Sequence, residues 1–201
     1  MLLGYQPANN TNSIIEGHQQ PIYPKPPSTP QRLCSLTWIK GAYMERAQKG
    51  EGGRVKFIYE GRTVYEWEQS LQEINIYIQV PEGVTSKMID CRISSHELNL
   101  GLKGNPPFLK EQTGGAVNVG ESFWLMDGGE LTINLQKLVR GETWSSALQG
   151  RGAEVDPATK EEMKKKIMLE RFQDEHPGFD FSNAEFNGAV PDANSFMGGV
   201  R

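Results

Sequence analysis

Between residues 74 and 135, apolar side chains alternate with polar ones along several short segments. In the clearest of these, Ile74, Ile76 and Ile78 are separated by Asn75 and Tyr77. The same spacing is seen at Ile89, Cys91 and Ile93, at Leu98, Leu100 and Leu102, and at Leu131, Ile133 and Leu135. A period of two places successive side chains on opposite faces of a β-strand. We therefore expect strands that each bury one face.

Turn signals separate these strands. Pro81-Glu82-Gly83, Ser94-Ser95-His96 and Asp127-Gly128-Gly129 follow or precede the alternating segments, and Gly, Pro and Asp are typical turn residues. Residues 65–69, 108–112 and 123–126 add three further short strands, which brings the total to about seven. Short strands at this spacing predict a mainly β fold, an antiparallel β-sandwich.

The hydrophobic period changes to that of a helix after residue 149. Asp156 is placed to cap a helix, and Pro157 suits its first turn. The helix should end near Glu175, because Pro177 disfavours helical geometry in the residue before it. The residues after Pro177, up to residue 201, are expected to be an irregular tail.

Residues 1–64 are predicted to be an N-terminal arm. The first 34 residues are rich in Asn, Gln, Ser, Thr and Pro, a composition that buries too little apolar surface to form a core. Prolines between residues 21 and 30 favour a polyproline II spacer, with a ligand for a proline-binding domain as the alternative. The apolar stretch with Trp38 and Tyr43, and a short strand at 55–59, need cover from the following domain or a partner.

The composition and motifs favour a non-enzymatic protein without cofactors. A net charge of −4 gives no reason to expect nucleic-acid binding. No histidine has metal-ligand spacing to another histidine or to a cysteine. Residues 115–122 have the glycine spacing of a phosphate-binding loop, but Glu121 replaces the lysine, so we expect a turn loop. No signal peptide or long apolar run is present, and we expect a cytoplasmic protein without membrane contact.

The tryptophans and Cys91 are candidates for the core or for an interface. We expect Trp67, Trp124 and Cys91 to pack inside the sandwich, because they lie in strand segments. Trp144 follows the last strand. It either caps the edge of the sandwich or faces a partner, since tryptophan is frequent in both settings.

Four motifs resemble those of one known family. Residues 65–74 read Y-E-W-E-Q-S-L-Q-E-I, residues 78–83 read I-Q-V-P-E-G, and residues 122–127 read S-F-W-L-M-D. Residues 169–182 read L-E-R-F-Q-D-E-H-P-G-F-D-F-S, which is the most specific of the four. Together they resemble the NudC family of CS-domain proteins, and the resemblance extends from about residue 65 to residue 182.

The resemblance implies a seven-stranded CS-type sandwich without catalytic activity or a bound nucleotide. Residues 65–148 would be the CS domain, and residues 149–201 the C-terminal helix and tail. Family members act as chaperones or co-chaperones with partners of the heat-shock class, and they support clients of the dynein pathway in the cytoplasm and cytoskeleton. The alternative is a resident structural subunit of a ciliary (axonemal) or other dynein-related assembly, anchored by the arm.

The candidate protein-binding residues lie mainly in the tail motif. They are Leu169, Arg171, Phe172, Pro177, Gly178, Phe179, Asp180 and Phe181, together with Trp144, Trp38 and Tyr43. Leu169 and Phe172 either bind a partner or fold back onto the domain, as amphipathic stripes usually do. Phe179 and Phe181 either reach a partner or insert into a groove of the sandwich.

Overall fold

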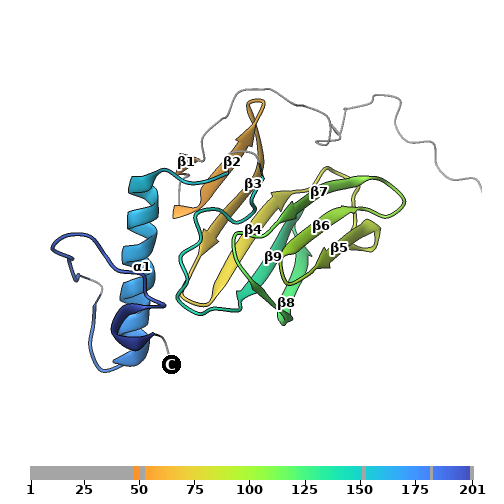
Figure 1. Cartoon of the computed structure of the whole chain (residues 1–201). Helices are drawn as coiled ribbons and strands as arrows, with labels where there is room; N and C mark the ends of the chain where they lie inside the picture. Colours follow the sequence, from red (N-terminus) through yellow and green to blue (C-terminus); the bar gives the residue numbers. More distant parts are fainter. Residues whose placement is uncertain (1–47, 50–52, 151–152, 182, 200–201) are drawn as a thin grey trace, which may run out of the picture. The chain divides into compact units, whose positions relative to one another are not determined.

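The computed structural model describes residues 48–49, 53–150, 153–181 and 183–199, so Trp38 and Tyr43 lie outside the described residues. Within these ranges, nine strands form two antiparallel sheets (Figure 1). The larger sheet has the order β1-β2-β3-β4-β9-β8 and the smaller one the order β5-β6-β7. The strands are Gln48–Lys49 (β1), Val55–Tyr59 (β2), Arg62–Gln69 (β3), Glu73–Gln79 (β4), Ile89–Ile93 (β5), Glu97–Leu102 (β6), Pro107–Gln112 (β7), Val117–Asp127 (β8) and Glu130–Lys137 (β9).

The core of the sandwich lies between the two sheets and is built from the alternating residues. Ile74, Ile76 and Ile133 are fully buried, and their polar neighbours point outward. Leu98 of β6 meets them from the smaller sheet, in the same core cluster. Trp67 is also buried, while Trp124, Cys91 and several other apolar side chains are half-buried against this cluster. The predicted antiparallel β-sandwich followed by a helix is therefore confirmed.

The number of strands differs from the prediction. The described residues form eight strands of five or more residues, plus the two-residue β1, where the sequence predicted about seven. The additional strand of the sandwich is β2, which coincides with the short strand expected at residues 55–59 of the arm; it pairs with β3 and places Phe57 opposite Tyr65. Their rings stack at a centroid distance of 5.0 Å, and Val55 is 1% exposed. The larger sheet thus begins N-terminal to Tyr65, because β2 contributes apolar side chains to the core.

The predicted turn loop at residues 115–122 is wrong for residues 117–122, which belong to β8. The pairing of β8 with β9 shifts between Asn118 and Phe123, so this part of the strand contains a bulge. Ser122 stabilises the bulge, since its hydroxyl donates to Asn118 O at 2.8 Å and accepts from Gln136 N at 2.9 Å. A bulge in an edge strand interrupts regular pairing with other chains.

Helix α1 spans Pro157–Glu175, as its cap and its stop signal predicted. Oδ1 of Asp156 accepts hydrogen bonds from the backbone of Ala158 and Thr159, at 3.0 and 3.1 Å. The hydrogen bonds from Thr159, first of all the one from its side chain, hold the pKa of the Asp156 carboxyl below its usual value. The tail after α1 is irregular apart from a short 3-10 helix at Phe196–Gly198. A second 3-10 helix, Ser86–Met88, lies between β4 and β5.

A second, smaller apolar cluster forms between α1, the tail and the turn after β3. Ile167 and Met168 of α1 are fully buried against Leu71 of that turn, and Val190 and Ala193 of the tail complete the cluster. The tail thus covers apolar surface of α1 that would otherwise be exposed to water.

Candidate protein-binding site

Helix α1 is held against the turn after β3 by polar contacts as well as by apolar packing. The Glu170 carboxylate accepts from the backbone N–H of Leu71 at 2.6 Å, and Arg140 pairs with Asp174 at 2.7 Å. These contacts fix the C-terminal half of α1, which carries three of the predicted binding residues, Leu169, Arg171 and Phe172.

A buried polar network lies next to this contact. Nζ of Lys137 donates to Ser70 O at 2.7 Å, to Glu142 O at 2.8 Å and to Oε1 of Gln69 at 3.2 Å. Burial lowers the pKa of Lys137 to about 7, although the carboxylates of Glu170 and Glu142 oppose this change. The network satisfies polar groups that the strand ends would otherwise leave buried without partners.

Trp144 is part of the core. It is 1% exposed, its backbone N–H donates to Oε1 of Gln69 at 3.0 Å, and its indole N–H donates to Glu142 at 3.1 Å. Gly114 and Gly115 lie directly against its ring, where a Cβ would collide. Of the two alternatives left open by the sequence, this burial favours the role of a cap on the sandwich.

Arg171 organises the tail. Its side chain is 5% exposed, and Nη1 donates to the carbonyl oxygens of Ala193 at 2.6 Å and Phe196 at 2.8 Å. Nη2 donates to the carbonyl of Gly199 at 2.9 Å, while Nε pairs with Glu175 at 2.7 Å. A planar guanidinium with several fixed donors suits such a role. The guanidinium is therefore occupied within the chain.

Phe172 connects the tail to the exposed end of α1. It is half-buried, and its ring lies 5.8 Å from that of Phe181, 6.4 Å from Phe186 and 6.1 Å from Phe196, measured between centroids. Leu169 is half-buried on the same helix. Phe172 thus folds back onto the chain with one part of its ring and leaves another part accessible.

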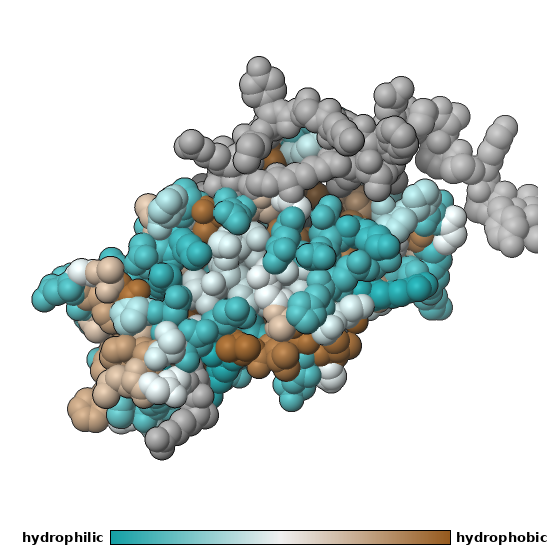
Figure 2. Space-filling view, in the orientation of Figure 1, coloured by the Kyte–Doolittle hydropathy of each residue, from teal (hydrophilic) through white to brown (hydrophobic). Residues whose placement is uncertain are grey.

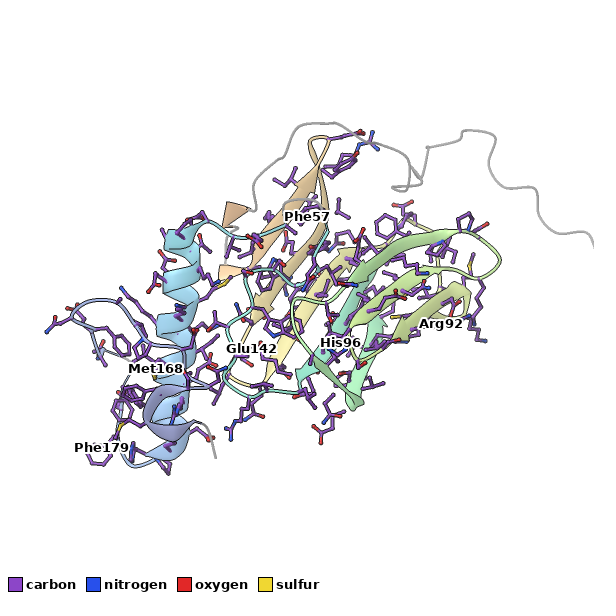
Figure 3. The ribbon with its side chains drawn as sticks, viewed as in Figure 1. Phe57, Arg92, His96, Glu142, Met168 and Phe179 are labelled. Atoms are coloured by element: carbon purple, nitrogen blue, oxygen red, sulfur yellow. The ribbon has the colours of Figure 1, made fainter. Side chains whose placement is uncertain are left out.

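An open aromatic groove lies beyond the C-terminal end of α1. It has a volume of about 390 Å³ and is lined by Phe172, His176, Phe179 and Phe181, which we call the aromatic groove. The ring of Phe179 lies 6.2 Å from that of Phe181 and 6.4 Å from that of His176. Phe179 is 69% exposed, and Figure 3 shows its ring pointing away from the chain. An exposed aromatic ring in an apolar hollow is typical of interaction sites.

The local sequence explains this geometry. Pro177 ends α1, and the backbone N–H of Phe179 donates to His176 O at 3.0 Å in a tight turn. The side chain of Gln173 accepts from the backbone N–H of Phe181, at 3.5 Å. Pro177, Gly178 and Asp180 are exposed on this turn. The tail motif thus brings five of the predicted residues, from Pro177 to Phe181, together beside Phe172.

Three further features of the described residues concern metal binding, a small cavity and the Cys91 thiol. No group of three or more His, Cys, Asp or Glu side chains could hold a metal ion among the described residues. A second cavity, beside Phe57, Tyr65 and Leu109, has a volume of about 20 Å³, which is close to the space needed by a single water molecule. Burial raises the pKa of Cys91 to about 11, so the reactive thiolate is disfavoured. In the part of the chain that the structure describes, no helix is long and apolar enough to cross a membrane.

The sequence analysis missed the exposed apolar side chains of β8. Phe123 is 51% exposed and Leu125 is 45% exposed, although Trp124 and Met126 between and beyond them pack against the core. Residues 123–126 are all apolar, so a period of two did not show which pair points outward. Only the register against β9 assigns the faces.

The chain is similar to several known proteins. The family model described as "CS domain" matches residues 63–137. Human "NudC domain-containing protein 2" is 36% identical over 126 residues, which cover 61% of this chain and 79% of the human protein. The "Nuclear movement protein nudc" of Schizosaccharomyces pombe is 28% identical over 153 residues, covering 59% of this chain and 91% of that protein. The crystal structure of the mouse "NudC domain-containing protein 2" matches at 29% identity with a TM-score of 0.33, covering 65% of this chain and 98% of that one.

Proposed function

The chain belongs to the NudC family of CS-domain proteins, and from this premise we propose that it is a non-enzymatic, protein-binding co-chaperone. Its partners are a chaperone of the heat-shock class and client proteins of the dynein pathway, and it acts in the cytoplasm. The name of the fission-yeast relative refers to nuclear movement, which supports a cytoskeletal pathway for this chain as well.

The exposed ring of Phe179 is the observation that carries this proposal. A phenylalanine that is 69% exposed contributes little to folding, because most of its apolar surface remains in contact with water. The same surface becomes buried when a partner side chain enters the aromatic groove. Burial of this ring then stabilises the complex, whereas the ring contributes little to the stability of the fold.

The groove is also positioned to bind without rearranging the sandwich. Its turn is fixed by the hydrogen bond between Phe179 and His176, and its base is formed by Phe172, which packs against the tail. A groove that is already formed needs little ordering when a partner binds, and this lowers the entropic cost of association.

The direct test is the affinity for the purified ninety-kilodalton heat-shock chaperone, measured by calorimetry for the full chain. Phe179→Ala should weaken binding about tenfold or more, since buried aromatic side chains are common hot spots. Met197→Ala is the matched control, because Met197 is 86% exposed on the same tail and lies outside the groove. Equal affinity of the two variants and the unmodified chain would contradict the proposed role of the groove.

The alternative function, a resident subunit of a ciliary or other dynein-related assembly, depends on the arm. Most of residues 1–64, including Trp38 and Tyr43, lies outside the described residues. Limited proteolysis of cell fractions separates the two functions. An arm that is protected only in a large, salt-resistant fraction supports the resident subunit, and an arm that is cleaved rapidly in every fraction supports the co-chaperone.

A further inference from the structure

An apolar strip lies on the outer face of β8, far along the sequence from the aromatic groove. Phe123 lies opposite Asn134 of β9 and Leu125 lies opposite Thr132, whereas Trp124 between them lies opposite the buried Ile133. Cross-strand partners share a face of the sheet, so Phe123 and Leu125 point away from the core. In the view of Figure 2 the visible surface is largely polar, and the outward direction of Phe123 and Leu125 follows from the register with β9.

The rest of the outer face is already satisfied by its own hydrogen bonds. The Glu73 carboxylate accepts from the side-chain amides of Asn75, Asn134 and Gln136, at 3.1, 2.8 and 3.1 Å. A network of this kind needs no partner to compensate its polar groups. Phe123 lies at the border of this network, where a polar side chain would cost the fold little, and yet it is apolar and half exposed.

Two exposed carboxylates flank the apolar strip. Glu121 precedes Phe123 by two residues and Asp127 follows Leu125 by two residues, and both acids are exposed. Neither side-chain carboxylate has a hydrogen-bond or ion-pair partner among the described residues. We call Glu121, Phe123, Leu125 and Asp127 the β8 strip. It combines two apolar anchors with two negative charges that the fold leaves uncompensated.

The surrounding face adds to the negative potential. The register places four more carboxylates on it, those of Glu66, Glu68, Glu73 and Glu130. The described cations on this face are Arg54, Lys56 and Arg62, fewer than the carboxylates. Arg54 and Lys56 pair with Glu66, at 3.8 and 3.2 Å. Arg54 also pairs with Glu130 at 3.6 Å and lies over the ring of Tyr77 at 3.4 Å. A surface with this balance attracts positively charged partners.

The position of β8 makes the strip accessible. β8 is the last strand in the order of the larger sheet, so one side of the strip has no neighbouring strand among the described residues. Edge strands are common sites of association with other chains. The bulge lies before Phe123 and includes Glu121, whereas residues 123–127 pair regularly with β9. Regular pairing therefore holds Phe123, Leu125 and Asp127 in place.

We propose that the β8 strip is a second docking site, which binds a basic segment of a partner protein. The segment carries apolar side chains that pack on Phe123 and Leu125 and flanking Lys or Arg side chains that pair with Glu121 and Asp127. This site is independent of the aromatic groove and of the co-chaperone function proposed above, because it lies on a different element and uses a different chemistry.

The test uses a fluorescently labelled synthetic peptide in which two leucines are each flanked by lysines, titrated with the full chain. Binding is followed by anisotropy at low and physiological salt. The peptide should bind, binding should weaken as salt is raised, and an otherwise identical peptide with glutamate in place of lysine should not bind. Amide NMR shifts should map the contact to residues 121–127.

Two variants separate the two parts of the strip. Leu125→Ser removes an apolar anchor, and Glu121→Gln combined with Asp127→Asn removes the charges. Each change should lower the affinity for the lysine peptide about tenfold. Neither should change the melting temperature, since these side chains are exposed. Met88→Ser is the matched control, because Met88 is 45% exposed, as Leu125 is, and lies outside the strip.

Four outcomes would overturn the proposal. The first is unchanged binding of the lysine peptide by the Leu125→Ser variant, and the second is equal binding of the glutamate peptide. The third is a dimer of the unmodified chain that Leu125→Ser dissociates, measured by sedimentation, which would assign the strip to self-association. Loss of binding in Phe179→Ala alone would instead locate the peptide in the aromatic groove, and the β8 strip would then have no role in it.

Discussion

The carboxylate of Glu170 accepts a hydrogen bond of 2.6 Å from the backbone N–H of Leu71, and it thereby ties α1 to the turn between β3 and β4. Leu71 also packs against Ile167 and Met168 of the same helix. One turn of the sandwich thus supplies both a polar and an apolar contact to α1. The position of the aromatic groove relative to β3 depends on this turn.

Glu170→Ala should destabilise the attachment of α1. The backbone N–H of Leu71 would lose a charged acceptor, and the free energy of unfolding should fall by about 1.5–3 kcal/mol. Urea denaturation measures this change. Lys165→Ala is the control, since Lys165 is exposed on the same helix, and it should change the stability by less than about 0.5 kcal/mol. Equal stabilities of the two variants would contradict the role of Glu170.

Arg171→Lys should release the tail while leaving the sandwich intact. A lysine ammonium cannot reproduce the fixed donors that reach the carbonyls of Ala193, Phe196 and Gly199. We expect amide hydrogen exchange in residues 190–199 to accelerate at least about tenfold, measured by mass spectrometry. Exchange in β4 and β9 is the internal control. Unchanged exchange in the tail would show that apolar packing alone holds it in place.

Much of the fold could be predicted from the sequence because its signals are local. The alternation at Ile74, Ile76 and Ile78 specifies a strand and its buried face, and Asp156 with Pro157 specifies the start of α1. The place of β2 in the sheet was harder to predict, since Val55–Tyr59 is a short segment next to a polar arm. Only its pairing with β3 places it in the sheet.

The candidate site was only partly predictable, because long-range contacts decide the role of each residue. The tail motif pointed to Phe179, and the structure leaves that ring exposed. The same motif pointed to Arg171, but its acceptors are backbone carbonyls more than 20 residues away, which no side-chain pattern reveals. The burial of Trp144 depends on Gly114 and Gly115 in a distant loop, and periodicity carries no information about such contacts.

The buried Lys137 should make stability dependent on pH. Burial lowers its pKa to about 7 in the folded chain, while the unfolded value is about 10.4. Between these values the unfolded chain binds more protons, so the free energy of unfolding should rise with pH by up to about 1.4 kcal/mol per unit. Below pH 7 both states are protonated, and the contribution is constant.

Lys137→Met tests this dependence, because methionine fills a similar volume and does not titrate. The difference in stability between the unmodified chain and Lys137→Met, measured by urea denaturation, should change in favour of the unmodified chain from pH 7 to pH 10. Taking the difference removes the contributions of other groups that titrate in the same range. A difference that does not vary with pH would show that Lys137 has an ordinary pKa.

Gly115→Ala should destabilise the sandwich through Trp144. An added Cβ would lie 2.7 Å from Cε2 of the indole and 2.8 Å from the carboxylate of Glu142, so the buried ring must shift. Overpacking of this kind costs about 1–3 kcal/mol. Gly120→Ala is the matched control, since its nearest neighbour would be Asn118 Oδ1 at 3.7 Å. Thermal unfolding that is equal for the two variants would contradict the close packing of Trp144.

The most direct test of the central claim is the suppression of aggregation of a heat-denatured client enzyme, with the melting temperature measured on the same samples. The account predicts that Phe179→Ala loses most of the suppression and keeps its melting temperature, while Met197→Ala retains both. Full suppression by Phe179→Ala would contradict the claim that the aromatic groove binds clients. A melting temperature that falls with the activity would show that Phe179 serves the fold.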